Sequence, residues 1–419
     1  MISLPYGHSS FSFDEEKEQA RVLESRIREM KSTVPGRDLV RAAMDEPYGG
    51  VTLQELAKDA KTCTLIISDH TRPVPSKDIL PEMLKDLREG NPDIAVTLLV
   101  ATGFHRLTQA QELRNKLGDD IFEHERIIVH DCSENNVRIG TLPSGAPLII
   151  DRRAVETDFL ISEGFIEPHF FAGFSGGRKS VLPGVCDRKT VLGNHCGAFI
   201  ASPYARTGVL ENNPIHRDMK AAAELAKLRY VVNVVIDPEK KTAAAFAGDP
   251  FLAHAAGCEF LRSYCEVKTE PADIVITTNG GAPLDQNIYQ SVKSMTAAEA
   301  ACRDGGVIIE ISECADGTGG DGFYHSLTEC ESPAALYKEF SETPQGETIP
   351  DQWESQILAR VLMHHPLIFV TRPELRDIIT DMKMIYAKDV DEALAKAKEI
   401  VGGEAKITVI PDGISVIVG

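Results

Sequence analysis

Short runs of β-branched residues alternate along this chain with longer amphipathic or alanine-rich stretches, and this alternation constrains the fold more than any other feature. In the first two-thirds of the chain, the candidate strands cover 63–68, 95–101, 127–129, 159–162 and 230–236. The candidate helices cover 76–89, 108–117 and 219–228. Such a pattern builds parallel sheets that are covered by helices. We therefore predict an α/β fold with mainly parallel sheets.

A second α/β rhythm follows residues 269–272. Its candidate strands cover 273–278, 306–310 and 367–370, and its candidate helices cover 291–303, 352–364 and 390–400. A chain of 419 residues is long enough for two domains at about 150 residues each or somewhat more. We predict an N-terminal domain over 1–268, a C-terminal domain over 269–405, and a tail over 406–419 that returns to one of them, with the N-terminal domain as one option.

The charge balance restricts the partners. With 44 Lys and Arg against 63 Asp and Glu, the net charge is −19, which disfavours nucleic acid and anionic membrane surfaces. No apolar run reaches the ~18 residues of a spanning helix, and the first residues do not resemble a signal peptide. The nine cysteines are scattered, with no C-x-x-C pair, which argues against a disulfide framework. We expect a cytoplasmic protein that binds a small molecule.

Four candidate strands run directly into loops that are dense in polar residues. These loops cover 69–73, 103–106, 167–169 and 279–281. In a parallel sheet, the loops at the carboxyl ends of the strands meet at one edge, so their side chains would share a crevice. His105 and His169 lie in two of these loops and could act as base and acid near neutral pH. The alternative is that each histidine is merely packed or solvated.

The glycine-rich segment 173–180 contains a lysine that a ligand could approach closely. The segment fails the Walker pattern, because Arg178 occupies a position that the pattern reserves for glycine. Lys179 is instead a candidate for a covalent tether, although a solvated lysine in a flexible loop is the simpler interpretation. His195 is a candidate metal ligand that has no second histidine at ligand spacing, so other donors would have to come from outside the protein.

The segment 289–293 begins a predicted helix and places Gln290 and Lys293 on neighbouring turns. An amide and an ammonium at a helix N-terminus suit a carboxylate, and Arg72 could clamp the same anion. An ordinary helix start with exposed polar residues explains the segment equally well.

Taken together and in this order, five motifs resemble the nickel-pincer lactate racemase family, whose members interconvert the stereoisomers of 2-hydroxy acids. The motifs are Asp69-His70-Thr71-Arg72-Pro73, Gly103-Phe104-His105-Arg106, Glu167-Pro168-His169 with Ser175-Gly176-Gly177-Arg178-Lys179, Gly193-Asn194-His195, and Tyr289-Gln290-Ser291-Val292-Lys293. The resemblance covers nearly the whole chain.

The resemblance implies a two-domain α/β enzyme with its site in the interdomain cleft. It also implies a pyridine mononucleotide with two sulfur donors, tethered as a thioamide to Lys179. Ni(II) would be held by a ring carbon, the two sulfurs and His195, a square-planar set. The nucleotide would contact Asp69, Lys179, Ser175, Gly176, Gly177 and Arg178. The substrate would contact Arg72, Tyr289, Gln290, Lys293 and Trp353. Separate enzymes would build and insert this cofactor.

The chemistry that the resemblance implies is reversible hydride transfer to the cofactor, with His105 and His169 exchanging the hydroxyl proton and with Arg72 and Lys293 holding the acid. Three alternatives stay open at this point. The first is a racemase or 2-epimerase of a larger hydroxy acid, such as a sugar acid, malate or an aryl 2-hydroxy acid. The second is a metal-dependent hydrolase, and the third is a non-catalytic binding module.

Overall fold

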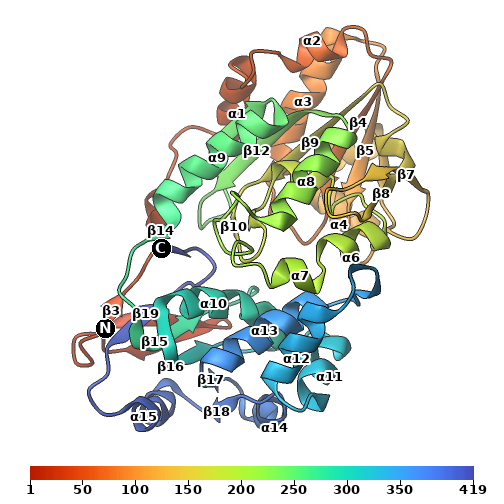
Figure 1. Cartoon of the computed structure of the whole chain (residues 1–419). Coiled ribbons are helices and arrows are strands. Elements are labelled where there is room, and N and C mark those ends of the chain that lie inside the picture. The colour runs from red at the N-terminus through yellow and green to blue at the C-terminus, as the bar shows by residue number, and fades with distance from the viewer.

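The apolar runs between residues 62 and 248 form the first of two six-stranded sheets, in the upper half of Figure 1. The computed structural model describes all 419 residues. The strand order is β13-β12-β9-β4-β5-β6, and only β13 runs antiparallel to its neighbour. The strands are β4 (Thr62–Ser68), β5 (Ala95–Ala101), β6 (Arg126–Val129), β9 (Phe159–Phe165), β12 (Leu228–Ile236) and β13 (Thr242–Gly248).

Alternate residues of these strands enter different cores, as the two-residue period of a strand requires. Leu65 and Ile67 pack against α1 (Gly36–Asp45) and α3 (Ser76–Gly90), whereas Ile66 belongs to the core that includes α8 and α9. The sheet is therefore buried on both faces, which explains its nearly continuous apolar strands. The other helices of this unit are α2 (Leu53–Ala57), α4 (Ala110–Leu117), α5 (Asp119–His124), α6 (Arg188–Asn194), α7 (Gly197–Ile200), α8 (Pro214–Leu225) and α9 (Pro250–Cys265).

The second sheet has the order β18-β17-β16-β15-β19-β3, and all of its strand pairs are parallel. Its strands are β3 (Arg21–Val22), β15 (Ala272–Thr278), β16 (Cys302–Ile311), β17 (Leu367–Val370), β18 (Ile385–Ala387) and β19 (Ile407–Ile410). Its helices are α10 (Ile288–Ala301), α11 (Asp321–Glu329), α12 (Pro333–Glu342), α13 (Gln352–His364), α14 (Arg376–Asp381) and α15 (Val390–Val401). The α/β class with mainly parallel sheets is thus confirmed.

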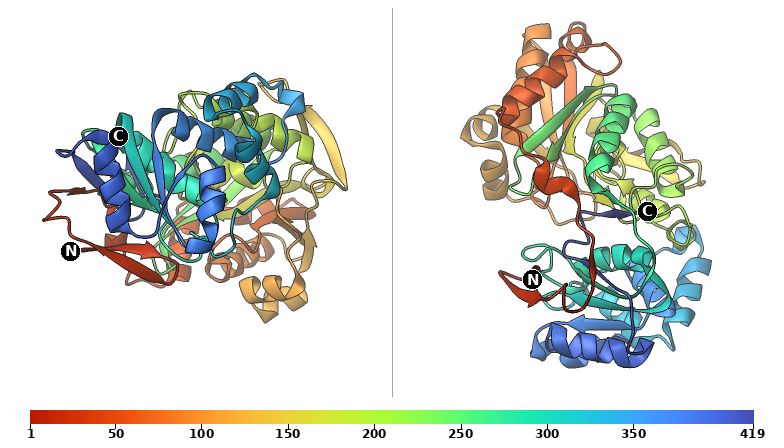
Figure 2. Two further views of the ribbon diagram at one scale, coloured as in Figure 1. Left: turned by 90° about the horizontal axis from the view of Figure 1, so that it is seen from below. Right: turned by 90° about the vertical axis from the view of Figure 1, so that its left-hand side faces the viewer.

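The N-terminal segment packs with the second unit, so not all of the residues 1–268 that were predicted for the first unit lie there. Leu4 of β1 (Ile2–Tyr6) and Phe13 of β2 (Ser9–Phe13) lie in the core of the second sheet, and β3 is its edge strand. In the right-hand view of Figure 2, the chain leaves this hairpin and rises into the upper unit.

The C-terminal tail divides between two sheets. Its strand β19 lies inside the second sheet, between β15 and β3, while β20 (Ile417–Val418) pairs with β14 (Glu266–Val267), just where the chain passes between the units. The strand of the tail therefore does not return to the first sheet. No helix of the structure has the combination of length and apolar character that crossing a bilayer requires.

The two units meet at the segment around α7. Amide nitrogens of the second unit donate to two carbonyls of the first, from Gln345 to Gly193 and from Gln356 to Gly197, both at 2.9 Å. A Cβ atom on Gly197 would lie 1.8 Å from the Phe340 carbonyl oxygen, so only glycine permits this approach. The short segment that contains His195 is thus held directly against the second unit.

Candidate active site

The loops after β4 and β5 bring a carboxylate and an imidazole together. Asp69 follows β4 directly and is 1% exposed, whereas His105 lies in the exposed loop after β5. Nδ1 of His105 lies 2.6 Å from Oδ2 of Asp69, and Oδ1 of Asp69 accepts hydrogen bonds from Thr71. Burial raises the pKa of Asp69, but the hydrogen bonds from His105 and Thr71 together lower it by more, so the pKa of Asp69 lies below its usual value. An ionised Asp69 therefore holds Nδ1–H of His105 and leaves Nε2 free to accept a proton.

His169 ends β10 (Pro168–His169), which follows β9. Its ring stacks on Phe170 with the centroids 5.1 Å apart, and it meets the edge of Phe171 at 4.5 Å. The backbone N–H of Ala172 donates to its Nδ1, so the free nitrogen, Nε2, carries the proton in the neutral ring. Burial, followed by the charges of Lys179 and Lys293, lowers the pKa of His169 well below its usual value.

His195 is the C-cap of α6 and is 6% exposed. Its Nδ1 donates to the carbonyl of Val191 at 3.0 Å, and its ring lies 5.1 Å from that of Trp353 and 5.2 Å from that of Phe171. Burial, followed by the charge of Lys179, lowers its pKa to about 3. The imidazole is therefore neutral, and its Nε2 lone pair is available to a metal.

Lys179 lies in the turn after the glycine-rich segment, and its ammonium is 5.8 Å from the centroid of the Phe171 ring. It forms no salt bridge in the chain. Burial, followed by the charges of Arg178 and Arg72, lowers its pKa well below the usual value. Burial thus favours the neutral, nucleophilic form of the Lys179 amine that a covalent attachment requires.

The glycine-rich segment differs from the prediction in one important respect: Arg178 points into the protein. Its guanidinium is 2% exposed and donates to the carbonyls of Ala172, Phe174, Ser175 and Gly176 and to two histidines, His216 and His254. All of these partners lie within the protein. The Arg178 side chain is therefore engaged within the protein, where it holds the segment that leads to Lys179, and the predicted contact of Arg178 with a nucleotide stays a prediction.

The neighbouring polar groups of this segment are also engaged internally. The Ser175 hydroxyl donates to the Phe165 carbonyl and accepts from the Glu167 N–H, while the N–H of Gly177 donates to Asn233 at 2.8 Å. Gly176 has a φ of 77°, and a Cβ atom there would lie 2.9 Å from the Phe165 carbonyl oxygen. These glycines permit close packing against β9, a sufficient reason for their presence.

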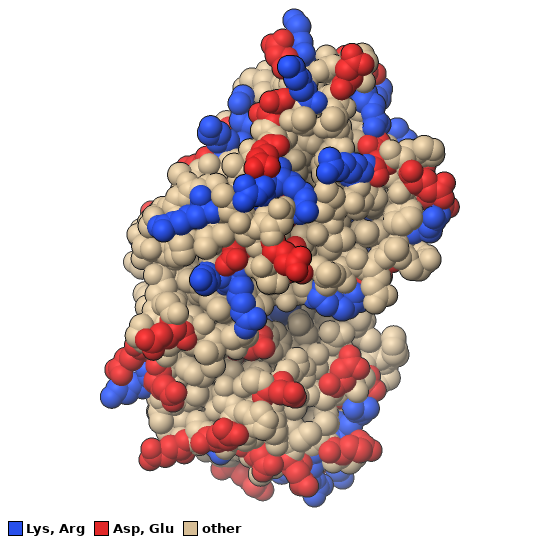
Figure 3. All heavy atoms as spheres, turned by 90° about the vertical axis from the view of Figure 1, so that its right-hand side faces the viewer, with Lys and Arg blue, Asp and Glu red and all other residues tan.

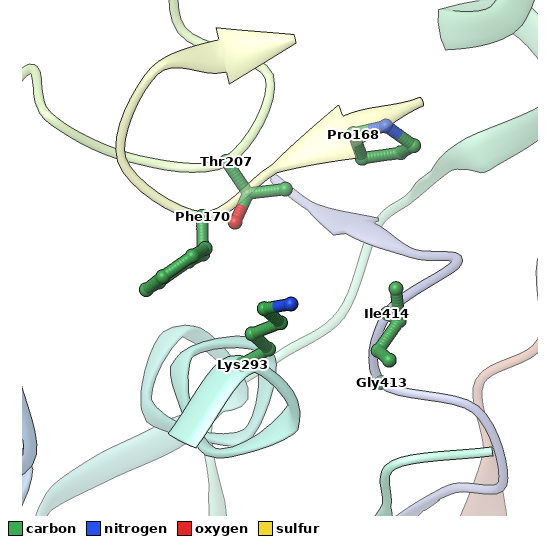
Figure 4. A pocket seen from close by; sticks show the side chains of 6 residues that line it. All are labelled: Pro168, Phe170, Thr207, Lys293, Gly413 and Ile414. Atoms are coloured by element: carbon green, nitrogen blue, oxygen red, sulfur yellow. The ribbon is translucent and has the colours of Figure 1, made fainter. Parts of the chain in front are cut away.

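The second unit contributes Lys293 and Gln290 from the first two turns of α10. Nζ of Lys293 donates to Oε1 of Gln290 at 2.6 Å. Figure 4 shows Lys293 reaching up from α10 beside a small cavity of about 20 Å³, which is also lined by Pro168 of β10 and by Gly413 of the tail. The lysine thus stands at the boundary between the two units. Burial, followed by the charge of Arg72, lowers its pKa.

An aromatic wall connects α10 with α13. Nε1 of Trp353 donates to the Tyr289 hydroxyl, which in turn donates to Asp351, both at 3.2 Å. The Trp353 ring is also 6.4 Å from that of Phe104 in the first unit. Trp353 of the second unit therefore packs against His195 and Phe104 of the first unit.

Glu354 was not expected from the sequence. It is 1% exposed, and its Oε1 has no hydrogen-bond partner. Burial raises its pKa to about 8, while the charge of Lys293 opposes this shift. A glutamate on an amphipathic helix is normally solvated, so the sequence does not indicate that Glu354 is buried. The one available signal is its place next to the only tryptophan.

No group of three or more His, Cys, Asp or Glu side chains is arranged to hold a metal ion. His195 therefore stands alone as a donor, with a free Nε2, close to the free amine of Lys179. These two residues fit a metal whose other donors belong to a group attached to that lysine, as the resemblance implied.

Two domain families match the chain. The lactate racemase N-terminal domain matches residues 6–208, and the lactate racemase C-terminal domain matches residues 267–418. Among characterised relatives, a lactate racemase of Thermoanaerobacterium thermosaccharolyticum is 53% identical over 420 residues and one of Lactiplantibacillus plantarum is 49% identical, each covering 100% of this chain and 99% of the relative.

The solved structures agree with this result. The structure of the lactate racemase apoprotein from T. thermosaccharolyticum superposes with a TM-score of 0.96 at 52% identity, covering 100% of this chain and 99% of that one. A protein from Thermotoga maritima shares the fold alone, with a TM-score of 0.66 at 18% identity over 93% of this chain. The family resemblance of the sequence motifs is thereby confirmed, and the chain belongs to the lactate racemase family and is an isomerase.

Proposed function

We propose that this chain interconverts the two enantiomers of lactate, using a nickel-pincer mononucleotide tethered to Lys179. The observation that carries the proposal is that each of the two histidines is fixed through its Nδ1, which leaves Nε2 for the substrate. Nδ1 of His105 lies 2.6 Å from Oδ2 of Asp69, and Nδ1 of His169 accepts from the N–H of Ala172. The comparisons favour an isomerase, and so give no support to the hydrolase or the binding module.

The residues present fit the implied cofactor. Lys179 would form the thioamide, because burial favours the neutral form of its amine, and Nε2 of His195 would complete the coordination of nickel. When bound, this group would supply a reversible acceptor for the hydride of the substrate Cα. Separate enzymes in the cytoplasm would be needed to make and insert it.

The carboxylate of the acid would lie between Arg72 and Lys293. The Arg72 guanidinium forms no salt bridge or hydrogen bond within the chain, and the charges of both residues act on His169. Gln290 orients Lys293 through its 2.6 Å hydrogen bond. Tyr289 and Trp353 would form the apolar wall that limits the substrate side chain and excludes water.

In one direction, Nε2 of His105 takes the proton of the substrate hydroxyl, which allows the Cα hydrogen to leave with its electron pair. The resulting 2-oxo acid is planar at Cα and has lost its handedness. Once the acyl group has turned, the hydrogen would be delivered to the opposite face of Cα, and His169, protonated on both ring nitrogens, would give the proton of Nε2 to the oxygen and be left as a neutral ring. The reverse reaction exchanges the two roles, which is why two histidines are needed. General acid–base catalysis of this kind raises the reaction rate by about 10²- to 10⁴-fold.

The test uses cofactor-loaded enzyme with each lactate enantiomer in D₂O. We expect racemisation with protium retained at Cα, because the hydrogen moves as hydride. Steady entry of deuterium at Cα would show proton abstraction and overturn the mechanism. A panel of malate, sugar acids and aryl 2-hydroxy acids tests the substrate, and faster turnover of one of these would replace lactate in the proposal.

Two variants test the cofactor assignment independently of turnover. Lys179→Ala should lose the added mass on the intact chain, and His195→Ala should lose nickel while the chain stays folded. Lys85→Ala and His124→Ala replace residues outside the site and should keep both. Retention of the adduct in Lys179→Ala would defeat the tether.

A further inference from the structure

The short segment that contains His195 is held on both sides by the second unit. Gly193 and Gly197 lie two residues before and two residues after this histidine. The carbonyl of Gly193 accepts a hydrogen bond from the side-chain amide of Gln345, and the carbonyl of Gly197 accepts one from Gln356, each at 2.9 Å. Both donors belong to the second unit, so contacts between the units fix the backbone around the histidine.

The first unit fixes the start of α6 more firmly than its end, where His195 lies. At the start, the hydroxyl of Thr190 bonds to the backbone of β8 (Pro147–Asp151). At the end, Nδ1 of His195 donates to Val191, which is one turn earlier in the same helix and therefore moves with it. Asn194 donates to a carbonyl of α8 at 3.2 Å, and its Oδ1 has no partner. The end of α6 therefore depends on the second unit for much of its support.

The second unit also packs against the imidazole ring itself. The centroid of the Trp353 ring, on α13, lies 5.1 Å from that of the His195 ring, and Trp353 is 9% exposed. Nearby, the carbonyl oxygen of Phe340 approaches Gly197 so closely that no side chain would fit there. The position of the His195 ring therefore depends on the position of the second unit.

Charge alone does not provide this precision. On the face drawn in Figure 3, basic side chains are frequent in the upper unit and acidic ones dominate the lower unit. Attraction between such surfaces is long-ranged and is screened by salt, so it does not select one register of the two units. A hydrogen bond is short and directional, and it does select a register. The two glutamines therefore determine where the backbone on either side of His195 lies.

We propose that Gln345 and Gln356 are positioning residues for the metal ligand His195, which they hold in place from the opposite unit. This inference rests on the proposed function, which assigns nickel to His195. Because the bound metal and the contact between the units both fix the same short segment, each stabilises the other. Separation of the units is then the step that loosens His195 and allows nickel to leave.

The first arm uses the apoprotein and needs no metal. Gln345→Glu keeps the size of the side chain but replaces the donating amide by a carboxylate, which repels the Gly193 carbonyl. We expect hydrogen exchange of the amides in residues 193–197 to become about fivefold faster or more. The emission of Trp353, the only tryptophan, should move to longer wavelength as the units separate and water reaches the ring. Unchanged exchange and emission would overturn the proposal.

The second arm measures the release of nickel from the holoenzyme to the chelator pyridine-2,6-dicarboxylate, while intact mass follows the adduct at Lys179. We expect Gln345→Glu to release nickel about tenfold faster or more and to keep the adduct, because the support of the ligand is lost and the tether is untouched. Release at the original rate would overturn the proposal. Loss of the adduct together with nickel would also overturn it, since that result indicates a general defect of the site.

Two matched controls lie in the second unit. Glu347→Ala changes an exposed residue in the same turn as Gln345. Ser341→Ala removes the 3.1 Å hydrogen bond that Gln356 makes within its own unit and leaves its bond to Gly197. Both should keep the original exchange and nickel release, and faster release from either would contradict the assignment to the two glutamines.

Gln356→Leu repeats both arms at the second position. Gln356 is fully buried, so this variant carries the greater risk of unfolding, whereas Gln345 is half-buried and its substitution should leave the fold intact. If the loaded enzyme does not racemise lactate, the proposed function fails while the result of the first arm still stands. The two failures are therefore distinguishable.

Discussion

Nδ1 of His105 lies 2.6 Å from Oδ2 of Asp69, which joins an exposed imidazole to a buried carboxylate. The carboxylate is fixed by Thr71 as well, so it cannot follow the histidine if the loop after β5 moves. This pair therefore determines which nitrogen of His105 faces the cleft. It is also the contact whose removal tests the proposed acid–base scheme most directly.

Asp69→Asn should lower kcat in both directions by about 10²- to 10⁴-fold, because the amide no longer selects the Nδ1–H tautomer. The measurement is the initial rate from each enantiomer at equal cofactor content. In the His105→Ala background, Asp69→Asn should lower kcat only slightly more, since the two substitutions remove the same function. Full additivity of the two losses would show that Asp69 acts elsewhere.

Glu354→Gln should change the pH dependence of substrate binding. The pKa of Glu354 is about 8, so its carboxyl is mostly neutral at pH 6.5 and ionised above pH 8. Only the ionised form helps Lys293 to stay charged. KM of the variant should therefore match the original at pH 6.5 and rise about fivefold or more above pH 8, as Lys293 loses its proton earlier. Identical KM profiles from pH 6 to 9.5 would contradict this role.

Arg178→Lys should destabilise the chain by about 2–4 kcal/mol, because several buried carbonyls lose their donor. The free energy of unfolding is measured with denaturant, and the adduct at Lys179 is measured by intact mass. The free energy of unfolding and the amount of adduct should fall together, since the guanidinium of Arg178 holds the loop that presents Lys179. Arg188→Lys, at an exposed position, is the control and should change stability by less than about 0.5 kcal/mol. A stable Arg178→Lys variant with complete adduct would contradict the positioning role.

Glu310→Gln tests a buried acid away from the site. Burial raises the pKa of Glu310 well above its usual value, although Ser294 and Ser312 donate to it. Because the folded state holds this proton more tightly than the unfolded state, its contribution is complete below the unfolded pKa of about 4.5 and is lost as pH rises toward the folded pKa.

The Gln variant should therefore be more stable than the original at pH 9, by about 1–2 kcal/mol, and nearly equal at pH 5. Thermal unfolding at the two pH values provides the comparison. The exposed residue Glu404 supplies the control, Glu404→Gln, which should show no such crossover. An equal shift of the midpoint at both pH values would show a packing effect and not a proton effect.

The local sequence pattern was sufficient to predict most of the helices and strands. The strand predicted at 95–101 is β5, and the one at 367–370 is β17, because runs of β-branched residues between turn residues form strands in most surroundings. Boundaries were less accurate. The helix predicted from residue 219 begins at Pro214, since Asn213 caps it through the N–H groups of Ile215 and His216.

Sequence by itself determined the α/β class, the family and the residues that could carry chemistry, because strand periodicity and short motifs are properties of neighbouring residues. Tertiary structure alone decided that β3 joins the second sheet, that Trp353 meets His195 across the cleft, and that Arg178 faces inward. Each of these depends on contacts between residues far apart in the chain. Such contacts depend on how the sheets and helices pack together in three dimensions, and this packing cannot be read from a local sequence pattern.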